Sequence, residues 1–322
     1  MRAPEFWQRD SWQARLLAPA AGLYDLAGRW RARVTTPSRA PVPVICVGNL
    51  STGGTGKTPV ALAIGTHLIV HGARVAFLSR GYGGAERGPV IVDPTRHRAS
   101  DVGDEPLLLA ALAPTIVARD RAAGARLAVS SGAEIIVMDD GLQNPGLAKS
   151  LAIVVVDGET GFGNGRVFPA GPLRESLARG MSRADLFVIM GADRHALGTS
   201  LGRHAPVVQA RLEPEPAPQL AGARCVAFAG IGRPEKFFAT LESLGAQLVE
   251  RISFPDHHPY RTDEAEQLLA RARNLDARAV TTAKDRVRLP AALHAQIDVV
   301  TVRALFDPAA ALFERVDHAR AG

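Results

Sequence analysis

The sequence is poor in cysteine and has no long apolar run. Its 322 residues include two cysteines, Cys46 and Cys225, which lie in apolar stretches and lack the C-x-x-C spacing of many metal sites. Neither a disulfide framework nor a structural zinc site is expected, and both residues are predicted to be core thiols of a protein in the reducing cytoplasm. The longest apolar runs, such as residues 16–24, have nine residues, whereas a helix needs about 20 to cross a bilayer. No transmembrane span is therefore predicted.

Excess positive charge is scarce outside the first forty residues. Lys and Arg outnumber Asp and Glu by 38 to 32, which gives a net charge of +6. Residues 1–40 contain seven arginines and three acidic residues, so +4 of this total lies in that segment and +2 in the rest of the chain. So small an excess argues against a broad nucleic-acid footprint, and no nucleic-acid partner is predicted.

The first forty residues differ from the rest of the chain. All three tryptophans lie there, and Leu23, Leu26, Ala27 and Trp30 recur at the spacing of one helix face. Pro19 is expected to interrupt any helix that runs through it, leaving two short pieces. Apolar and aromatic side chains beside arginines fit a helix that lies on an anionic membrane surface. They fit equally well a helix packed on the protein with its arginines in solvent.

From residue 41 onward, short apolar β-rich runs alternate with helical patterns. These runs cover residues 42–47, 74–79, 134–138, 151–156 and 185–190. After a Pro- and Glu-rich stretch at 213–219, a shorter series follows at residues 223–229, 247–253, 279–282 and 298–302. Such alternation predicts an α/β fold, with a mostly parallel sheet covered by helices on both faces and a smaller C-terminal α/β domain. The expected divisions are residues 1–40, 41–215 and 216–322.

The clearest motif is VICVGNLSTGGTGKTPVALAI, at residues 44–64. A buried strand, a Gly-rich loop and the start of an apolar helix follow one another, which is the arrangement of a phosphate-binding P-loop. The predicted nucleotide-binding residues are Ser51, Thr52, Gly53, Gly54, Thr55, Gly56, Lys57 and Thr58. Lys57 is expected to reach the β- and γ-phosphates, and the Thr58 hydroxyl to bind Mg²⁺. Ser51 stands where the motif ordinarily has its first glycine, but the context predicts a P-loop NTPase-like fold.

The same loop excludes some P-loop proteins. Thr52 stands where ATPases that dimerise through a second lysine carry that lysine, and no Asn-Lys-x-Asp motif for reading guanine occurs. GTP-dependent switch proteins and ATPases that dimerise through a second lysine are therefore disfavoured.

Two acidic motifs accompany the loop. Asp139 and Asp140 end the run EIIVMDD, where a carboxylate beside a P-loop holds Mg²⁺. Because they are adjacent, their side chains are expected to point in different directions. Asp104 and Glu105 follow Gly103 at the start of a helical run, where acids also serve as caps. Asp104 is a candidate for positioning a hydroxyl and accepting its proton.

Basic and histidine-containing segments are less specific. Arg121, and Arg174 in a long loop after a predicted strand, are candidates for binding anions, although a solvated arginine is the commoner case. His257, in FPDHHPY of the second domain, is a candidate for orienting or relaying a proton across a cleft, or is simply a polar loop residue. Thr282-Ala283-Lys284-Asp285 stays ambiguous.

Together these stretches resemble the tetraacyldisaccharide 4′-kinase (lipid A 4′-kinase) family over nearly the whole chain. The most specific pieces are VGNLSTGGTGKTP, GDEP, DDGLQ, VVVDGETGFGNGRVFPAGPLRE and FPDHH. The resemblance implies an ATP- and Mg²⁺-dependent lipid kinase that phosphorylates the 4′-hydroxyl of a membrane-embedded tetraacyldisaccharide 1-phosphate to give lipid IVA. Ser51 fits, since the family also has Ser or Thr at that position.

The resemblance also implies residue roles. Asp104 matches the catalytic aspartate and His257 its assisting histidine, while Asp139 and Asp140 match acidic residues near the metal. Arg121 and Arg174 match arginines that face phosphates. The implied metal ligands are Thr58, Glu105, Asp139 and Glu175. Asn144 stands where the family often has His, so it receives no role.

A lipid with several acyl chains does not leave the bilayer readily, so the resemblance favours a peripheral enzyme on the cytoplasmic face of the inner membrane, docked through its first forty residues. Closure of two domains is expected to exclude water. No obligate protein partner is predicted.

The rival interpretation is a membrane-docked P-loop ATPase switch that recruits a protein, which leaves Asp104 and His257 without a role.

Overall fold

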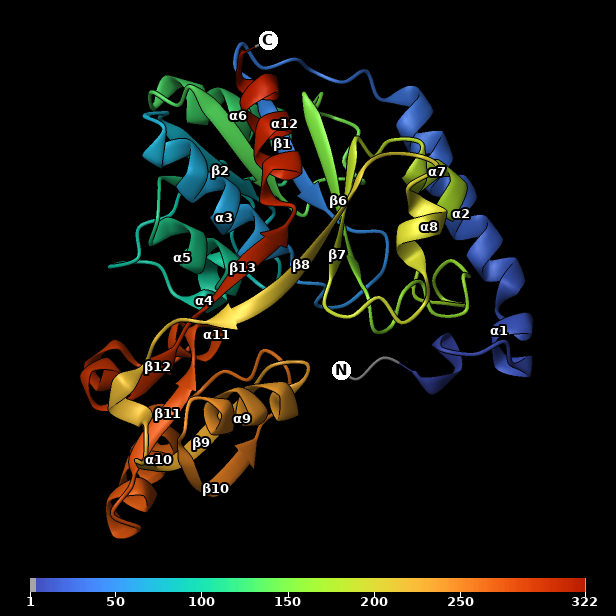
Figure 1. Cartoon of the computed structure of the whole chain (residues 1–322). Coiled ribbons are helices and arrows are strands. Elements are labelled where there is room, and N and C mark those ends of the chain that lie inside the picture. Colours follow the sequence, from blue (N-terminus) through green and yellow to red (C-terminus); the bar gives the residue numbers. More distant parts are fainter. Residues whose placement is uncertain (1–3, 322) are drawn as a thin grey trace.

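The computed structural model describes residues 4–321, which form two α/β lobes (Figure 1). The large lobe contains a nine-stranded sheet in the order β13-β8-β7-β6-β1-β5-β2-β4-β3. Its strands are β1 (Val44–Gly48), β2 (Val75–Ser79), β3 (Val90–Ile91), β4 (Thr115–Val117), β5 (Ile135–Asp139), β6 (Leu151–Asp157), β7 (Leu186–Met190), β8 (Val207–Pro214) and β13 (Val302–Asp307). Only the outermost strands of this described sheet, β3 and β13, are antiparallel to their neighbours. The predicted mostly parallel sheet is confirmed.

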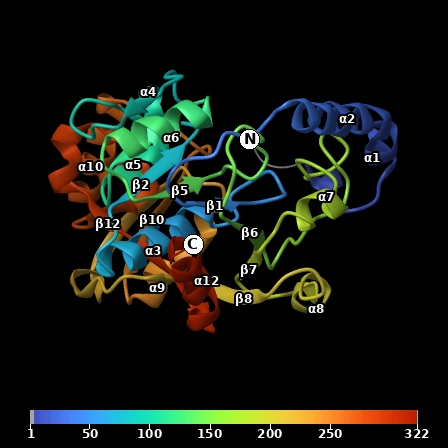
Figure 2. The same cartoon turned by 90° about the horizontal axis from the view of Figure 1, so that it is seen from above.

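Helices cover both faces of the large sheet (Figure 2). One face carries α3 (Lys57–Val70), α5 (Asp104–Ala110) and α12 (Ala309–Ala321), and the other carries α6 (Arg121–Ser130), α7 (Leu177–Met181) and α8 (Leu197–Leu201). The short helix α4 (Ala99–Val102) precedes α5. In β1, the side chains of Ile45 and Val47 face the first layer of helices, and those of Val44 and Cys46 face the second. Because both faces are covered, every residue of β1 is buried. Such fully apolar central strands are expected when both faces are covered.

The small lobe is a four-stranded parallel sheet in the order β10-β9-β11-β12. Its strands are β9 (Arg224–Ala229), β10 (Gln247–Ser253), β11 (Arg278–Thr282) and β12 (Asp298–Val300). Its helices are α9 (Pro234–Ser243), α10 (Thr262–Asn274), α11 (Ala283–Arg286) and the 3-10 turns η2 (Pro218–Leu220) and η3 (Ala291–Gln296). The helices α9 and α10 bury apolar side chains on opposite faces of this sheet.

The C-terminal part of the chain departs from the expected division at 216–322. The run expected as one strand at 298–302 is divided at Thr301 between β12 and β13. β13 then pairs antiparallel with β8, and α12 buries Leu312 and Val316 in the same core as α3. Residues 302–321 therefore return to the large lobe, as Figure 1 shows in red. The first two residues of the expected linker at 213–219 are the last two residues of β8. They are part of the strand because they pair with β13.

The N-terminal segment lies along one side of the large lobe (Figures 1 and 2). It contains η1 (Glu5–Trp7), α1 (Trp12–Leu16) and α2 (Ala18–Val34). The helix breaks at Leu17, and Pro19 occupies the first turn of α2, where its missing N–H costs nothing. The second piece is longer than expected, with 17 residues. No helix within residues 4–321 combines the length and apolar character needed to cross a membrane.

Candidate active site

The phosphate-binding loop joins β1 to α3 at the carboxyl edge of the large sheet. Gly53 and Gly56 have φ values of +115° and +85°, conformations that residues with a side chain rarely adopt. The side-chain amide of Asn49 donates to the Ser51 carbonyl (2.7 Å) and to Thr55 Oγ1 (3.2 Å). The loop is thus held open by its own contacts, and the N-terminus of α3 is available to an anion.

Thr58 and Asp139 meet beside this loop. The Thr58 hydroxyl donates to Asp139 Oδ2 over 3.1 Å, because β1 and β5 are parallel neighbours. The other oxygen, Asp139 Oδ1, is buried and has no hydrogen-bond partner among the described residues. Burial raises the pKa of Asp139 to about 6, although Lys57 opposes that shift. A buried carboxylate oxygen without a partner, next to a hydroxyl, has the hard oxygen donors that suit Mg²⁺.

The metal would need further ligands. Within residues 4–321, no group of three or more His, Cys, Asp or Glu side chains is placed to hold a metal ion. Mg²⁺ is commonly bound by one or two carboxylates together with substrate phosphates and water, so Thr58 and Asp139 fit a site completed by a nucleotide.

Asp140 points away from Asp139, as expected for adjacent residues. It has a left-handed backbone with φ of +55° and accepts a hydrogen bond from Arg174 Nη1 (2.7 Å). Its Oδ1 also lies 3.8 Å from Lys57 Nζ. Burial lowers the pKa of Lys57, and Asp140 opposes this effect. The second carboxylate therefore holds two cations of the phosphate side in place.

Arg121 begins α6 and is almost fully buried. Its Nη1 donates to the Ala118 carbonyl, while its Nε has no partner among the described residues. Burial lowers the pKa of Arg121 to about 10, and nearby Asp140 acts against this shift. A buried guanidinium with an unused donor is compatible with the expected anion contact, which stays a prediction.

Asp104 is the first residue of α5 and is buried at the boundary between the lobes. Its Oδ2 lies 2.8 Å from Nδ1 of His257 and 3.1 Å from Nε of Arg288, both in the small lobe. The hydrogen bond to Asp104 raises the pKa of His257, while burial opposes it. The sequence-predicted pair is therefore in direct contact, although 153 positions separate its members.

Glu105 contacts a different part of the small lobe. Its Oε1 accepts a hydrogen bond from Lys284 Nζ over 3.1 Å. Burial alone would lower the pKa of Lys284, but Glu105 outweighs it and the pKa is raised. Lys284, which the sequence left ambiguous, thus balances the charge of Glu105 across the lobe boundary.

Glu175 makes no hydrogen bond or ion pair with Thr58 or Asp139 among the described residues. Its carboxylate is buried, pairs with Arg183 and Arg179, and accepts a hydrogen bond from Gln143 Nε2 (3.0 Å). Gln143 also donates to the Asn49 carbonyl (2.9 Å). These contacts brace the start of the phosphate loop, so they give no support to the metal-ligand role expected for Glu175, which stays a prediction. Asn144 is a turn residue whose Oδ1 accepts from the Gly146 N–H.

A second ionic contact between the lobes was not predicted from the sequence. Arg233 donates to Asp157 Oδ2 (2.7 Å) and Glu159 Oε2 (3.0 Å), and Lys236 Nζ lies 2.8 Å from the same Glu159 oxygen. The available signal was weak: VVVDGET ends β6, and Arg233 precedes α9 after GIG. Asp157 ends a strand of the large sheet and Arg233 follows a strand of the small sheet. The two residues are in contact because the lobes face each other.

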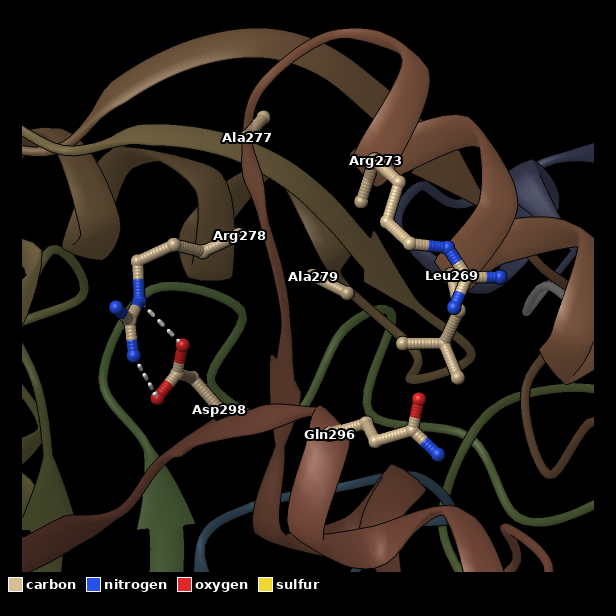
Figure 3. A pocket seen from close by; sticks show the side chains of 8 residues that line it. Leu269, Arg273, Ala277, Arg278, Ala279, Gln296 and Asp298 are labelled. Atoms are coloured by element: carbon tan, nitrogen blue, oxygen red, sulfur yellow. Dashed lines mark hydrogen bonds and ion pairs between the residues drawn. The ribbon is translucent and has the colours of Figure 1, made fainter.

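The small lobe also has a shallow depression of about 180 Å³ between α10 and the edge of β11 (Figure 3). An ion pair between Arg278 and Asp298 borders it, and Arg273 and Gln296 also line it. None of its lining residues belongs to the cluster around Asp104.

Comparison with known proteins agrees with this geometry. Residues 13–320 match the family model described as tetraacyldisaccharide-1-P 4′-kinase. The chain belongs to this family. A tetraacyldisaccharide 4′-kinase from Rhodospirillum centenum is 54% identical over 309 residues, covering 94% of this chain and 92% of that protein. One from Parvibaculum lavamentivorans is 55% identical over 297 residues, covering 90% and 87%.

A solved member of the family supports the fold. The crystal structure of the apo form of LpxK from Aquifex aeolicus in complex with ATP is similar to this chain, with a TM-score of 0.78 and 26% sequence identity. The match covers 95% of this chain and 99% of that one. The fold class and the family resemblance expected from the sequence are thereby confirmed.

Proposed function

We propose that this chain is a lipid kinase that transfers the γ-phosphate of ATP to the 4′-hydroxyl of tetraacyldisaccharide 1-phosphate, giving lipid IVA. Family membership over residues 13–320 supports the substrate and the reaction. The observation that carries the mechanism is the contact of buried Asp104 with His257 at the boundary between the lobes.

The phosphate side supplies binding and charge. Backbone N–H groups of residues 51–58 and the ammonium of Lys57 hold the triphosphate, as P-loops do. Arg174, fixed by Asp140, and buried Arg121 add positive charge near the transferred group. The role of this positive charge is to stabilise the negative charge that spreads over the phosphoryl oxygens during transfer.

The Thr58 hydroxyl and Asp139 Oδ1 would hold Mg²⁺ together with phosphate oxygens. When bound, Mg²⁺ neutralises charge on the β- and γ-phosphates. Glu105 is the further candidate ligand, but only after it leaves Lys284, to which it is hydrogen bonded.

The acceptor side supplies the base. Asp104 orients the sugar hydroxyl for in-line attack and takes its proton, and His257 donates from Nδ1 to hold the carboxylate. Because the raised pKa of His257 keeps its ring protonated to higher pH, the charged donor stabilises the Asp104 carboxylate. Facing lobes exclude water, which limits futile hydrolysis of ATP.

The outer face of α2 supports docking on the cytoplasmic surface of the inner membrane. Leu23, Leu26 and Trp30 are 70%, 61% and 67% exposed. The opposite side of α2 is fixed to the protein through buried Asp25, which accepts from the Ser176 N–H (3.2 Å). The apolar side chains therefore face outward rather than into the core, as an interfacial helix requires.

The test is to follow ATP labelled in its γ-phosphate with purified protein and lipid disaccharide in detergent micelles. The expected result is label in the lipid, with a requirement for Mg²⁺. A disaccharide already phosphorylated at the 4′ position is the matched control and should remain unlabelled. Release of inorganic phosphate alone, stimulated by a protein rather than by lipid, would instead identify an ATPase switch and overturn the proposal.

A further inference from the structure

Arg288 follows α11 and is one of the most deeply buried charged residues of the small lobe. Its side chain is 3% exposed, and its Nε lies 3.1 Å from Asp104 Oδ2. This is the same carboxylate oxygen that His257 Nδ1 contacts at 2.8 Å. One hydrogen bond and one ion pair from the small lobe thus converge on the same oxygen of the large lobe.

The position of Arg288 is fixed from within the small lobe. Its Nη1 donates to the Gly230 carbonyl (2.9 Å), and its Nε to the Lys284 carbonyl (3.1 Å). Fully buried Asp285 lies 3.6 Å from the same Nη1 and accepts hydrogen bonds from the Gly230 N–H and the Tyr260 hydroxyl. A guanidinium held at this many points has lost its freedom before it meets Asp104.

The backbone of His257 is fixed at the same place. Its N–H donates to the Gly230 carbonyl over 3.1 Å, the carbonyl that also accepts from Arg288. His257 is held there in a left-handed conformation with φ of +61°, which costs energy for a residue with a side chain. The histidine and the arginine that reach Asp104 are therefore both held by the Gly230 carbonyl, which fixes their positions relative to each other.

The consequence lies in the second oxygen of Asp104. The hydrogen bond from His257 and the ion pair with Arg288 are both made to Oδ2, and no hydrogen bond to Oδ1 is found within residues 4–321. A carboxylate pinned through one oxygen keeps the other directed and available to a substrate hydroxyl.

We propose that Arg288 is a positioning residue of the kinase reaction, which fixes the Asp104 carboxylate through Oδ2 so that Oδ1 meets the acceptor hydroxyl. The proposal rests on the proposed function. It differs from a purely structural role for Arg288, in which the guanidinium only ties the small lobe together through Gly230 and Asp285.

The experiment is a double-mutant cycle of Arg288→Met with Asp104→Asn, measured as transfer of labelled phosphate to the lipid. Arg288→Met alone should lower kcat about 10- to 100-fold, a fraction of what a positioned base contributes, with the KM for ATP unchanged. In the Asp104→Asn background the same substitution should change the residual rate less than about threefold, because the carboxylate it positions is gone.

Two further variants keep the result interpretable. Arg288→Lys retains a cation near Asp104 and should recover part of the lost kcat. Arg286→Gln is the matched control, since Arg286 ends α11 two residues before Arg288 but is exposed, and it should leave kcat unchanged. Thermal unfolding of each variant is measured in parallel, and Arg288→Lys serves as the test variant where Arg288→Met does not fold.

The proposal is overturned if an Arg288 variant that folds keeps full kcat, or if its loss is equally large with Asp104→Asn. A different result would show that the proposed function itself is wrong. In that case the wild-type protein would leave the lipid unlabelled, or Asp104→Asn alone would retain its turnover.

Discussion

The two sides of the active site are assembled in different ways. On the phosphate side, Lys57, Thr58, Asp139 and Asp140 all belong to the large lobe, and their carboxylates meet hydroxyl or cationic groups of that same lobe. On the acceptor side, Asp104 and Glu105 belong to the large lobe but are paired with cations of the small lobe. The contacts of these phosphate-side residues lie within the large lobe, whereas those of the acceptor side form where the two lobes meet.

This difference separates binding from chemistry. In the proposed mechanism, a nucleotide finds its loop, its lysine and the carboxylate proposed to hold the metal in the large lobe alone. The proposed base, Asp104, is contacted by His257 and Arg288 of the small lobe, so we expect its geometry to depend on how the two lobes meet. Coupling of this kind favours phosphate transfer to the bound lipid over transfer to water.

The largest effect on the phosphate side is expected from Asp139→Asn. Loss of a metal-binding charge should reduce transfer about 100-fold or more. Stability should change in the opposite direction. The pKa of Asp139 is raised from 3.8 to about 6 in the folded protein, so the folded state loses stability as the pH rises through that window. Without metal at pH 8, the variant should therefore be more stable by about 1–3 kcal/mol.

Urea denaturation in the presence of EDTA checks the stability change, and lipid labelling checks the activity. The stability gain should shrink as the pH falls from 6 to 4 and disappear at about pH 3, where Asp139 is protonated in both states. Asp317→Asn is the matched control, because Asp317 pairs with His67 on the outer surface of α3 and α12. A variant with near-normal labelling, or one less stable than wild type at pH 8, would contradict the phosphate-side account.

A smaller effect is expected from Arg233→Gln, which removes the second ionic contact between the lobes. Arg233 is 40% exposed on its side chain, and exposed pairs contribute little. The variant should lose about two- to fivefold in kcat/KM for the lipid at low salt, and the difference should shrink at high salt. Arg251→Gln, which breaks a pair inside the small lobe, is the control. Equal losses in both variants would show that contact between the lobes is not what Arg233 contributes.

The phosphate side was predictable because its signals are local in sequence. The strand, glycines and GKT of residues 44–64 predict one turn of chain, and that turn positions Lys57 and Thr58. The contact of Thr58 with Asp139 agrees with the carboxylate expected beside the P-loop, and it arises because β1 and β5 are parallel neighbours. The loop itself needed one supersecondary unit, whereas the contact of Thr58 with Asp139 joins residues 81 positions apart and needed the pairing of β1 with β5 as well.

The acceptor side was only partly predictable. The family resemblance paired His257 with Asp104 as its assisting histidine. The spacing of the residues did not, because nothing in the sequence alone shows that two residues 153 positions apart are in contact. Arg288 gave no signal, since a lone arginine after a short helix is ordinarily solvated. The return of residues 302–321 to the large lobe was missed for a related reason. An amphipathic helix such as α12 shows that it needs a partner, but not which sheet provides it.

The N-terminal helix illustrates a further limit. Its spacing defined the apolar face at Leu23, Leu26 and Trp30, but left open whether that face packs on the protein or points outward. The choice depends on Asp25, whose buried contact with Ser176 turns the face outward. A single polar anchor on the opposite side of the helix is not evident in a hydrophobic pattern.

The most direct test of a base assembled between two lobes is lipid labelling by Asp104→Asn, with ATP affinity measured on the same preparation. The account predicts that phosphate transfer falls about 100-fold or more while ATP binding stays within about twofold of wild type. If Asp104→Asn labels the lipid at a rate close to that of the wild-type protein, the carboxylate held by His257 and Arg288 is not the base, and the account is wrong.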